Sequence, residues 1–362
     1  MAFEIDLLPV GNGTKSGDAI LLRYGDLDNG SDKQTVILID GGYEVTADKI
    51  KQHLQKYYNC RSNGKYVIDL VILSHPDSDH VSGLAAIAQD DEIQINYILM
   101  QRPWDELDPS LFADGRITKA SLERRIKNVF SKAVELDRAT EDCENLSWYT
   151  DTINCPFGAT LKILGPSKEF YRKLIAECSK TPPTASGINE TTCNSASLEE
   201  EEDFYEDQEI EWNDNETTSL INESSLILLF EYKDTDGKDH KILFTGDAGK
   251  RGLTEAIRYA DEIGISLENI EIIKMPHHGS RKNVSPEIMD SLYSQGTTCY
   301  ISCSGNDEGH HPSKRLVNLL IQKGYRVLST SGSTLHRSHN APERNNFKKA
   351  EEKPYYPKME KL

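Results

Sequence analysis

The sequence Leu73-Ser74-His75-Pro76-Asp77-Ser78-Asp79-His80-Val81-Ser82-Gly83 concentrates side chains that bind metal ions. Four of them fall within six residues: His75, Asp77, Asp79 and His80. The apolar run that precedes them, Ile68 to Leu73, predicts a buried strand, and Val81 to Ala88 predicts the start of a helix. An ordinary polar turn gives no reason for two histidines and two aspartates at this spacing. The stretch therefore predicts a metal site in a strand-to-helix turn.

Two distant segments supply further candidate ligands, which a metal-dependent hydrolase needs because one loop cannot surround two cations. Lys241 to Asp247 is a short β-rich run that ends in a carboxylate, and Ile270 to Ser280 is another that contains the pair His277 and His278. All three groups follow the end of an expected strand, where α/β sheets carry their chemistry. Taken alone, the aspartate fits a helix N-cap and the histidine pair fits a turn. Together and in this order they favour a metal centre.

The chain resembles the metallo-β-lactamase superfamily in three motifs: His75-x-Asp77-x-Asp79-His80, Thr245-Gly246-Asp247 and His277-His278-Gly279-Ser280. More narrowly, it resembles the branch that contains the C-terminal domain of the DNA-uptake channel protein ComEC and related phosphorylcholine esterases. The segments Gly17 to Leu22, Val36 to Gly42 and Gly309 to Pro312 agree with this resemblance, which spans residues 3–335 with two insertions. It implies an α/β fold of the αββα sandwich type, with two facing mixed sheets and helices outside.

The resemblance also implies a role for each ligand. His75 and Asp77 are expected to hold one metal ion, Asp79, His80 and His278 to hold the other, and Asp247 to bridge them. The sequence alone does not decide whether His278 or His277 is the ligand of the pair. A shared carboxylate holds two cations about 3.5–4 Å apart, and bound water then becomes a hydroxide nucleophile near neutral pH.

Residues around these ligands receive roles from the same resemblance. The expected catalytic residues are Asp79, His277 and His311; His277 is expected to contact the scissile group or donate a proton, and His310 competes with His311 for the second contact. Asp40 is expected to orient ligands without binding metal directly. Lys274, Arg281 and Lys282 flank the histidine pair and are expected either to meet a substrate phosphate or to be ordinary surface charges.

One departure from the superfamily bears on the metal. No histidine lies between His80 and His240, and Asn222 falls near the place where most members supply another histidine ligand. Asp77 also stands where many relatives have histidine. Both changes shift preference from zinc towards hard cations, so we expect one or two Zn²⁺ or Mn²⁺ ions per chain, with Asn222 as a weak ligand.

Composition and charge limit the domain organisation. The chain has 362 residues and a formal net charge of −18, which argues against a polyanionic substrate. Eleven of the acids lie between 199 and 216, where there is no Lys or Arg. We expect one metallo-β-lactamase-like domain over residues 1–340, a helical insertion at 102–145, a flexible acidic insertion at 180–216 and a loosely packed charged tail at 341–362. The acidic insertion is either a solvated loop or a partner-binding or autoinhibitory segment.

The cellular compartment is predicted from features that the sequence lacks. No apolar stretch approaches the length of a membrane span, and the N-terminus is acidic where a signal peptide is basic. Seven cysteines without a CxxC pair are typical of a reducing compartment. The expected location is therefore the cytoplasm, without contact to a membrane.

Three functions fit these observations. The first is a metal-dependent phosphodiesterase or nuclease that acts on DNA or RNA. The second is a hydrolase of small molecules such as a phosphodiester, a cyclic nucleotide or a lactone. The third is a metal-bearing interaction module or an effector subunit of a bacterial defence system, which binds partner proteins through its insertions and turns over little substrate.

Overall fold

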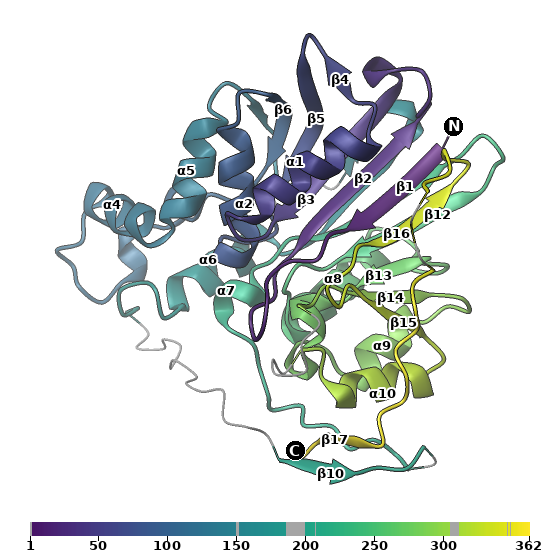
Figure 1. The fold of residues 1–362 in the computed structure, drawn as a ribbon. Helices are drawn as coiled ribbons and strands as arrows, with labels where there is room; N and C mark the ends of the chain where they lie inside the picture. Colours follow the sequence, from purple (N-terminus) through teal and green to yellow (C-terminus); the bar gives the residue numbers. More distant parts are fainter. Residues whose placement is uncertain are drawn as a thin grey trace.

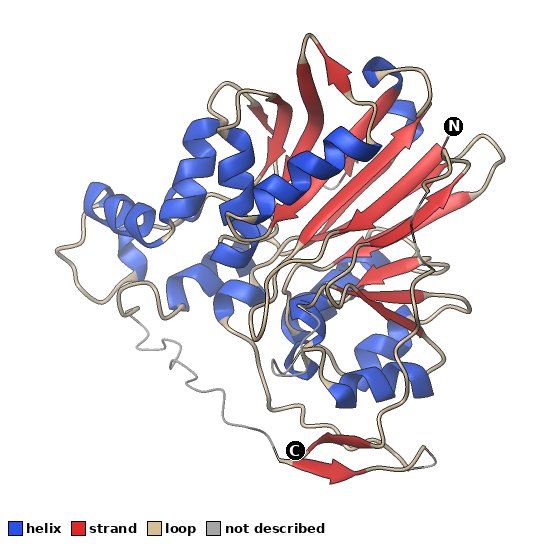
Figure 2. Ribbon diagram, viewed as in Figure 1, coloured by secondary structure: helices blue, strands red, loops and turns tan. Residues whose placement is uncertain are grey.

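The structure, a computed structural model, describes residues 2–149, 152–185, 200–206, 208–304, 311–345, 347 and 349–362. Two large mixed sheets face each other with helices on their outer faces (Figures 1 and 2). This arrangement confirms the αββα sandwich that the sequence resemblance implied.

The first sheet has the strand order β16-β1-β2-β3-β5-β6-β7, with β4 paired to β5. Its strands are β1 (Ala2–Leu7), β2 (Ala19–Gly25), β3 (Gln34–Gly41), β4 (Arg61–Ser62), β5 (Lys65–Ile72), β6 (Ile93–Leu99), β7 (Glu144–Asn145) and β16 (Leu335–His339). Strands β3, β5 and β6 run parallel to one another. Every residue of β3 is buried, as expected for a strand covered on both faces.

The second sheet has the strand order β15-β14-β13-β12-β11-β9-β8. Its strands are β8 (Thr152–Asn154), β9 (Thr160–Gly165), β11 (Ile227–Lys233), β12 (Asp239–Phe244), β13 (Ile272–Lys274), β14 (Thr298–Ile301) and β15 (Arg326–Ser329). Strands β12 to β15 are parallel, so their carboxyl ends lie at the same rim.

Aromatic side chains join the inner faces of the two sheets. The Tyr24 ring on β2 lies 5.3 Å from the Phe230 ring and 5.0 Å from the Tyr232 ring, both on β11, measured between ring centroids. Such large side chains contribute most of the apolar area that holds a sandwich together. They position the rim of one sheet against the rim of the other.

The helices cover the outer faces. They are α1 (Thr46–Tyr57), α2 (Ser78–Ala88), α3 (Pro103–Glu106), α4 (Lys119–Val129), α5 (Ser131–Ala139), α6 (Lys168–Glu177), α7 (Leu220–Glu223), α8 (Lys250–Glu262), α9 (Pro286–Leu292) and α10 (Lys314–Gln322). Helices α1 and α2 lie on the first sheet, and α8, α9 and α10 lie on the second (Figure 1). Among the residues that the structure describes, no helix is both long and apolar enough to cross a bilayer.

The described parts of the acidic insertion and the tail differ from the prediction, because they pack together. Strand β10 (Glu201–Asp203) pairs antiparallel with β17 (Lys358–Glu360). Buried Phe204, Ile210, Leu319 and Met359 form a small apolar cluster beneath them. The Glu360 carboxylate accepts hydrogen bonds from the first backbone N–H groups of α10. Apolar burial and a helix cap therefore order these charged segments, while residues 186–199 and 207 lie outside the described part.

A buried network of charges attaches the end of the chain to its beginning. The Asp6 carboxylate on β1 lies 2.7 Å from Nδ1 of His336 on β16 and 3.0 Å from Nε2 of His53 on α1. The Arg344 guanidinium lies 3.0 Å from the same carboxylate. The segment after β16 is held by this network rather than loosely attached.

Candidate metal centre

The candidate metal centre forms where strands of both sheets end at one rim. The turn His75 to His80 follows β5, Asp40 lies near the end of β3, Asp247 follows β12, and His277 and His278 follow β13. Parallel strands bring their carboxyl ends to the same edge of a sheet. The facing of the two sheets then places the two rims together.

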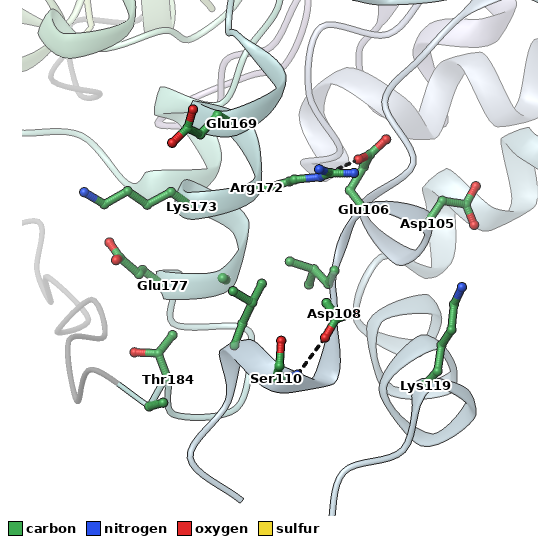
Figure 3. A pocket seen from close by; sticks show the side chains of 14 residues that line it. Asp105, Glu106, Asp108, Ser110, Lys119, Glu169, Arg172, Lys173, Glu177 and Thr184 are labelled. Carbon is green, nitrogen blue, oxygen red and sulfur yellow. Dashed lines mark hydrogen bonds and ion pairs between the residues drawn. The ribbon is translucent and has the colours of Figure 1, made fainter. Parts of the chain in front are cut away.

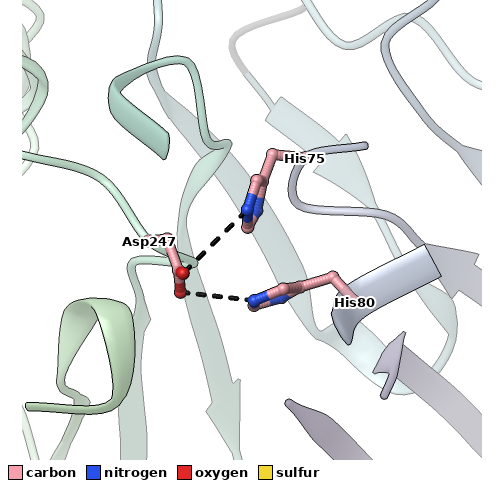
Figure 4. A group of neighbouring side chains, drawn as sticks. All are labelled: His75, His80 and Asp247. Carbon is pink, nitrogen blue, oxygen red and sulfur yellow. Dashed lines mark ion pairs between the residues drawn. The ribbon is translucent and has the colours of Figure 1, made fainter. Parts of the chain in front are cut away.

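The first group consists of two histidines and the aspartate between them (Figure 4). Nε2 of His80 lies 3.4 Å from Oδ1 of Asp247, and Nε2 of His75 lies 4.0 Å from its Oδ2. All three side chains are buried. Each oxygen of the carboxylate therefore faces a different imidazole.

The second group contains Asp79, His80 and His278. Nε2 of His278 lies 3.5 Å from Oδ2 of Asp79, and Nε2 of His80 lies 4.0 Å from the same oxygen. Oδ2 of Asp247 is 3.9 Å from Nε2 of His278. Asp247 consequently reaches both groups.

The buried polar atoms of these groups fit a divalent cation. Among the described residues, the following have no hydrogen-bond partner: Nε2 of His75, Nε2 of His80, both ring nitrogens of His278 and Oδ1 of Asp247. Buried polar atoms are nearly always hydrogen-bonded, and an ion is one of the standard reasons for an exception. Imidazole nitrogens and carboxylate oxygens are also the ligands that zinc and manganese take. The site can therefore hold metal.

Asp40 fixes the orientation of one of these rings. Its carboxylate accepts hydrogen bonds from the backbone N–H and the hydroxyl of Ser74, at 2.8 and 2.7 Å. Its Oδ2 lies 2.8 Å from Nδ1 of His80. A carboxylate on the outer nitrogen of a histidine directs the other nitrogen towards a metal. Asp40 thus contacts the Nδ1 side of the His80 ring, whereas Nε2 on the other side of the ring faces Asp247.

The charges of the site shift the pKa values of its members. Burial opposes the charged form of every one of these groups, yet neighbouring carboxylates raise the pKa of His80 well above its usual value and that of His278 to about 9. The same imidazoles hold the pKa of Asp247 well below its usual range despite its burial. Burial and the nearby His80 lower the pKa of His75. Without a cation, protons on the imidazoles balance the negative charge of the carboxylates. A bound cation would displace those protons.

Asp77 lies at the edge of the site with a different partner. Its Oδ2 is 3.9 Å from Nε2 of His75, but its Oδ1 is 2.5 Å from the ammonium of Lys180. Among the described residues it belongs to none of the close groups of ligand atoms. The ion pair competes with any metal for this carboxylate.

His277 occupies the open side of the site. Its side chain is 29% exposed, and Nε2 lies 3.9 Å from Oδ2 of Asp247. Nδ1 lies 3.1 Å from Oδ1 of Asn283, and the Asn222 amide nitrogen lies 3.4 Å from Nε2. The His311 ring centroid is 5.2 Å away, whereas His310 lies outside the described residues. The structure thus brings His277, Asn222 and His311 to one side of the ligands.

The prediction that Lys274 contacts a substrate phosphate was wrong. Its side chain is 1% exposed, and its ammonium forms an ion pair with Asp18 and donates to the backbone oxygen of Gly246 at 3.0 Å. Burial opposes its charge, but the carboxylates of Asp18 and Asp247 raise its pKa. Lys274 is a buried cation beneath the site because strand β13 carries it inward.

The other two basic residues of the flank differ from each other. The Arg281 guanidinium binds both oxygens of Glu216 at 2.9 Å, so its charge is already neutralised. Lys282 is exposed. Only Lys282 of the three is exposed beside the histidine pair.

Asp18 is a member of the site that sequence reasoning missed. It is fully buried, with Oδ1 3.5 Å from Nδ1 of His278 and Oδ2 3.9 Å from Nδ1 of His80. Lys274 and His278 lower its pKa despite its burial. The sequence feature that could have identified Asp18 is the pair Gly17-Asp18 directly before an apolar strand.

A separate cavity of about 700 Å³ lies between helix α6 and the segment that contains α3 (Figure 3). Its charged lining residues are Asp105, Glu106, Asp108, Lys119, Glu169, Arg172, Lys173 and Glu177. Arg172 already pairs with Glu106 at 2.9 Å. None of the candidate metal ligands lines this cavity, so it is distinct from the metal centre.

Comparisons with known proteins match part of this chain. Residues 16–111 match the metallo-beta-lactamase superfamily. ComE operon protein 3 of Bacillus subtilis (strain 168) is 32% identical over 121 residues, which are 33% of this chain and 14% of that protein. The chain thus spans a small part of that relative.

Two solved structures are matched at lower identity. Tm1679, a metal-dependent hydrolase of the beta-lactamase superfamily, is 12% identical with a TM-score of 0.45, over 94% of this chain and 100% of that one. Metallo-beta-lactamase SMB-1 bound to 2-mercaptoethanesulfonate is 10% identical with a TM-score of 0.33, over 76% and 82%. The residues 16–111 that match the metallo-beta-lactamase superfamily include Asp18, Asp40 and the whole turn from His75 to His80.

Proposed function

We propose that this metal-dependent hydrolase cleaves phosphodiester bonds and that its substrate is DNA or RNA. The observation that carries the hydrolase is the set of buried ligand atoms without hydrogen-bond partners, with Asp247 reaching both groups. Two imidazole–carboxylate groups that share one aspartate suit a pair of cations. We propose Zn²⁺ or Mn²⁺ as these cations.

In the ligand assignment that we propose, His75 and Asp247 would hold the first cation, with Asp77 as a weaker third ligand once Lys180 releases it. Asp79, His80 and His278 would hold the second, and Asp247 would serve both. The side-chain oxygen of Asn222 already accepts from the Ser219 hydroxyl at 2.9 Å, so it would be a weak ligand, and its amide nitrogen lies 3.4 Å from Nε2 of His277.

The remaining residues prepare the site for hydrolysis. Cations held here would lower the pKa of a bound water and so supply a nucleophile at neutral pH. Asn283 accepts from Nδ1 of His277, which puts the ring proton on Nδ1 and leaves the lone pair on Nε2, beside the Asn222 amide and towards Asp247. Burial lowers the pKa of His277, so the ring is neutral at pH 7 and can accept a proton there. His311 bounds the same side of the site.

Two features support a nucleic acid over a small diester. The chain resembles the ComEC branch, and ComE operon protein 3 of Bacillus subtilis (strain 168) is 32% identical to it over 121 residues. Exposed Lys282 lies four residues after His278, where it can meet a backbone phosphate. The net charge of −18 opposes this, so binding should depend on local cations and weaken steeply with salt.

The test is hydrolysis by the purified protein of labelled single-stranded DNA, duplex DNA, RNA and a chromogenic phosphodiester, with Mn²⁺ or Zn²⁺ added. The variant Asp79→Ala/His80→Ala removes ligands from both groups. Asp137→Ala is a matched control, because Asp137 on α5 is 23% exposed and Asp79 is 26% exposed.

Cleavage of a polymer that is lost in the double variant but kept in Asp137→Ala would support the proposal and name the preferred strand. Turnover of the chromogenic diester alone would replace it by a small-molecule phosphodiesterase. No cleavage of any substrate by metal-loaded protein would overturn the proposal and favour an interaction module.

A further inference from the structure

A second group of metal-binding side chains lies at the opposite end of the sandwich. Asp234 directly follows β11, His240 is the second residue of β12, and His339 is the last residue of β16. Their ligand atoms lie within 4.8 Å of one another. Strand β16 belongs to the first sheet and β11 and β12 to the second, and Figure 1 shows β16 beside β12. The group therefore joins the two sheets far from the rim that carries Asp247.

The distances within the group suit a small cation. Nε2 of His240 lies 3.2 Å and Nε2 of His339 lies 2.9 Å from the same oxygen of Asp234. Ligand atoms around a tetrahedral zinc ion, each at about 2.0–2.1 Å, are separated by about 3.3 Å. Nε2 of His339 is buried and makes no hydrogen bond in the described structure despite this short approach. The atom faces the carboxylate in an orientation that suits coordination better than donation.

The other side of His240 has the partner expected behind a metal ligand. Its Nδ1 lies 3.0 Å from the Glu271 carboxylate. Without a cation, the ring faces a carboxylate at each of its two nitrogens. With a cation at Nε2, Nδ1–H donates to Glu271, which is the usual arrangement behind metal-bound histidine. The Phe3 ring stacks on His240 with 4.7 Å between centroids and holds its plane.

The Asp234 carboxylate is itself oriented. Its Oδ1 accepts from the backbone N–H groups of Asp236 and Lys238, at 2.9 and 3.0 Å, which leaves Oδ2 for the two histidines. Asp236 lies at the open side, with Oδ2 3.8 Å from Nε2 of His339. A fourth ligand is thus available from this carboxylate or from water.

A comparison within the protein shows what is unusual here. Asp6 also lies between two histidines, His53 and His336, but these approach opposite oxygens and the Arg344 guanidinium neutralises the carboxylate. At the second group, the nearby cations Lys238 and Arg337 pair with Glu271 and not with Asp234. The charge of Asp234 is left for the two imidazoles or for a cation between them.

We propose that Asp234, His240 and His339 bind a zinc ion that fastens the two sheets together. The site is structural, because its three protein ligands lie at the end of the sandwich opposite the candidate catalytic rim. It is independent of the proposed hydrolysis.

The test counts zinc. The full chain is loaded with Zn²⁺, freed of excess by gel filtration, and its zinc per chain is measured by mass spectrometry of the metal. His339→Gln is expected to hold one zinc fewer than the wild type. His336→Gln is the matched control: His336 lies on the same strand and also contacts a buried aspartate, so its zinc count should equal the wild-type count.

The count is repeated with Asp79→Ala/His80→Ala as background, where adding His339→Gln should again remove one zinc per chain. Equal counts with and without His339 would overturn the proposal. Because the readout is bound metal, failure of the hydrolysis assays leaves this result interpretable.

A second variant separates loss of the ligand from loss of the fold. His339→Cys replaces imidazole by a thiolate, which also binds zinc. It should recover the missing zinc and, when loaded with Co²⁺, show a thiolate charge-transfer band in the near ultraviolet. A folded His339→Cys protein without this band would contradict the site.

Discussion

Asp40 and His80 lie 40 positions apart in the sequence, yet Oδ2 of the carboxylate is 2.8 Å from Nδ1 of the imidazole. The same carboxylate accepts two hydrogen bonds from Ser74, directly before the first ligand of the turn. One buried side chain therefore holds both the turn and one of its rings. The position of Nε2 of His80, 3.4 Å from Asp247, depends on this contact.

Asp40→Asn should lower the affinity for Zn²⁺ or Mn²⁺ by about 10–100-fold, the usual cost of losing such a partner. The amide N–H₂ would face Nδ1 of His80 and oppose the tautomer that directs Nε2 inward. Asn tolerates the left-handed backbone at this position, where φ is 55°, so the fold should survive. Titration against a chromophoric chelator measures the affinity. A value equal to that of wild type would show that Asp40 does not orient the ligand.

Lys180→Gln should raise metal affinity at the first group by up to about fivefold. The variant releases Asp77 from an ion pair, and a partly exposed pair contributes roughly 0.2–1 kcal/mol. Manganese titration of wild type and variant measures the change, with Lys282→Gln as the control for loss of a nearby positive charge. If Lys180→Gln and Lys282→Gln bind manganese with the same affinity, Asp77 is not a metal ligand.

Lys274→Met should lower the free energy of unfolding by about 3–5 kcal/mol, because it leaves the buried carboxylate of Asp18 without its ion-pair partner. Urea unfolding followed by circular dichroism measures this. Lys282→Met removes an exposed lysine from the same flank and should leave stability unchanged. If the Lys274→Met protein were as stable as wild type but had a raised KM, the hypothesis that Lys274 contacts a substrate phosphate would be supported again.

The lowered pKa of Asp6 predicts that the free energy of unfolding depends on pH. Burial opposes its charge, but hydrogen bonds from His336 and His53 and the charge of Arg344 hold its pKa below the ordinary value. A lowered pKa in the folded state stabilises the protein above the unfolded pKa of about 4, and this contribution is lost as pH falls further.

Asp6→Asn should therefore reduce the free energy of unfolding by about 3–5 kcal/mol at pH 7, with a difference from wild type that shrinks below about pH 4. Urea unfolding between pH 3 and 7 measures both. Asp91→Asn, at an exposed carboxylate, should show no difference at any pH. A constant deficit of the Asp6 variant at every pH would mean that packing and not charge is responsible.

Local sequence was sufficient to predict the strands and turns that carry the ligands. The apolar run before His75 became β5, and the runs before Asp247 and His277 became β12 and β13. Periodicity and apolar content are properties of neighbouring residues, so they can be recognised before the chain folds. The sandwich itself was implied by the resemblance of the three ligand motifs to the metallo-β-lactamase superfamily.

The partners of charged side chains were decided by tertiary structure alone. Nothing local distinguishes Lys274, which is buried against Asp18, from exposed Lys282 eight positions later. Likewise, His240 and His339 converge on Asp234 only because β16 returns to pair with β1 beside the second sheet. An ion pair or a metal group depends on the distance between atoms from remote segments, and sheet packing sets that distance.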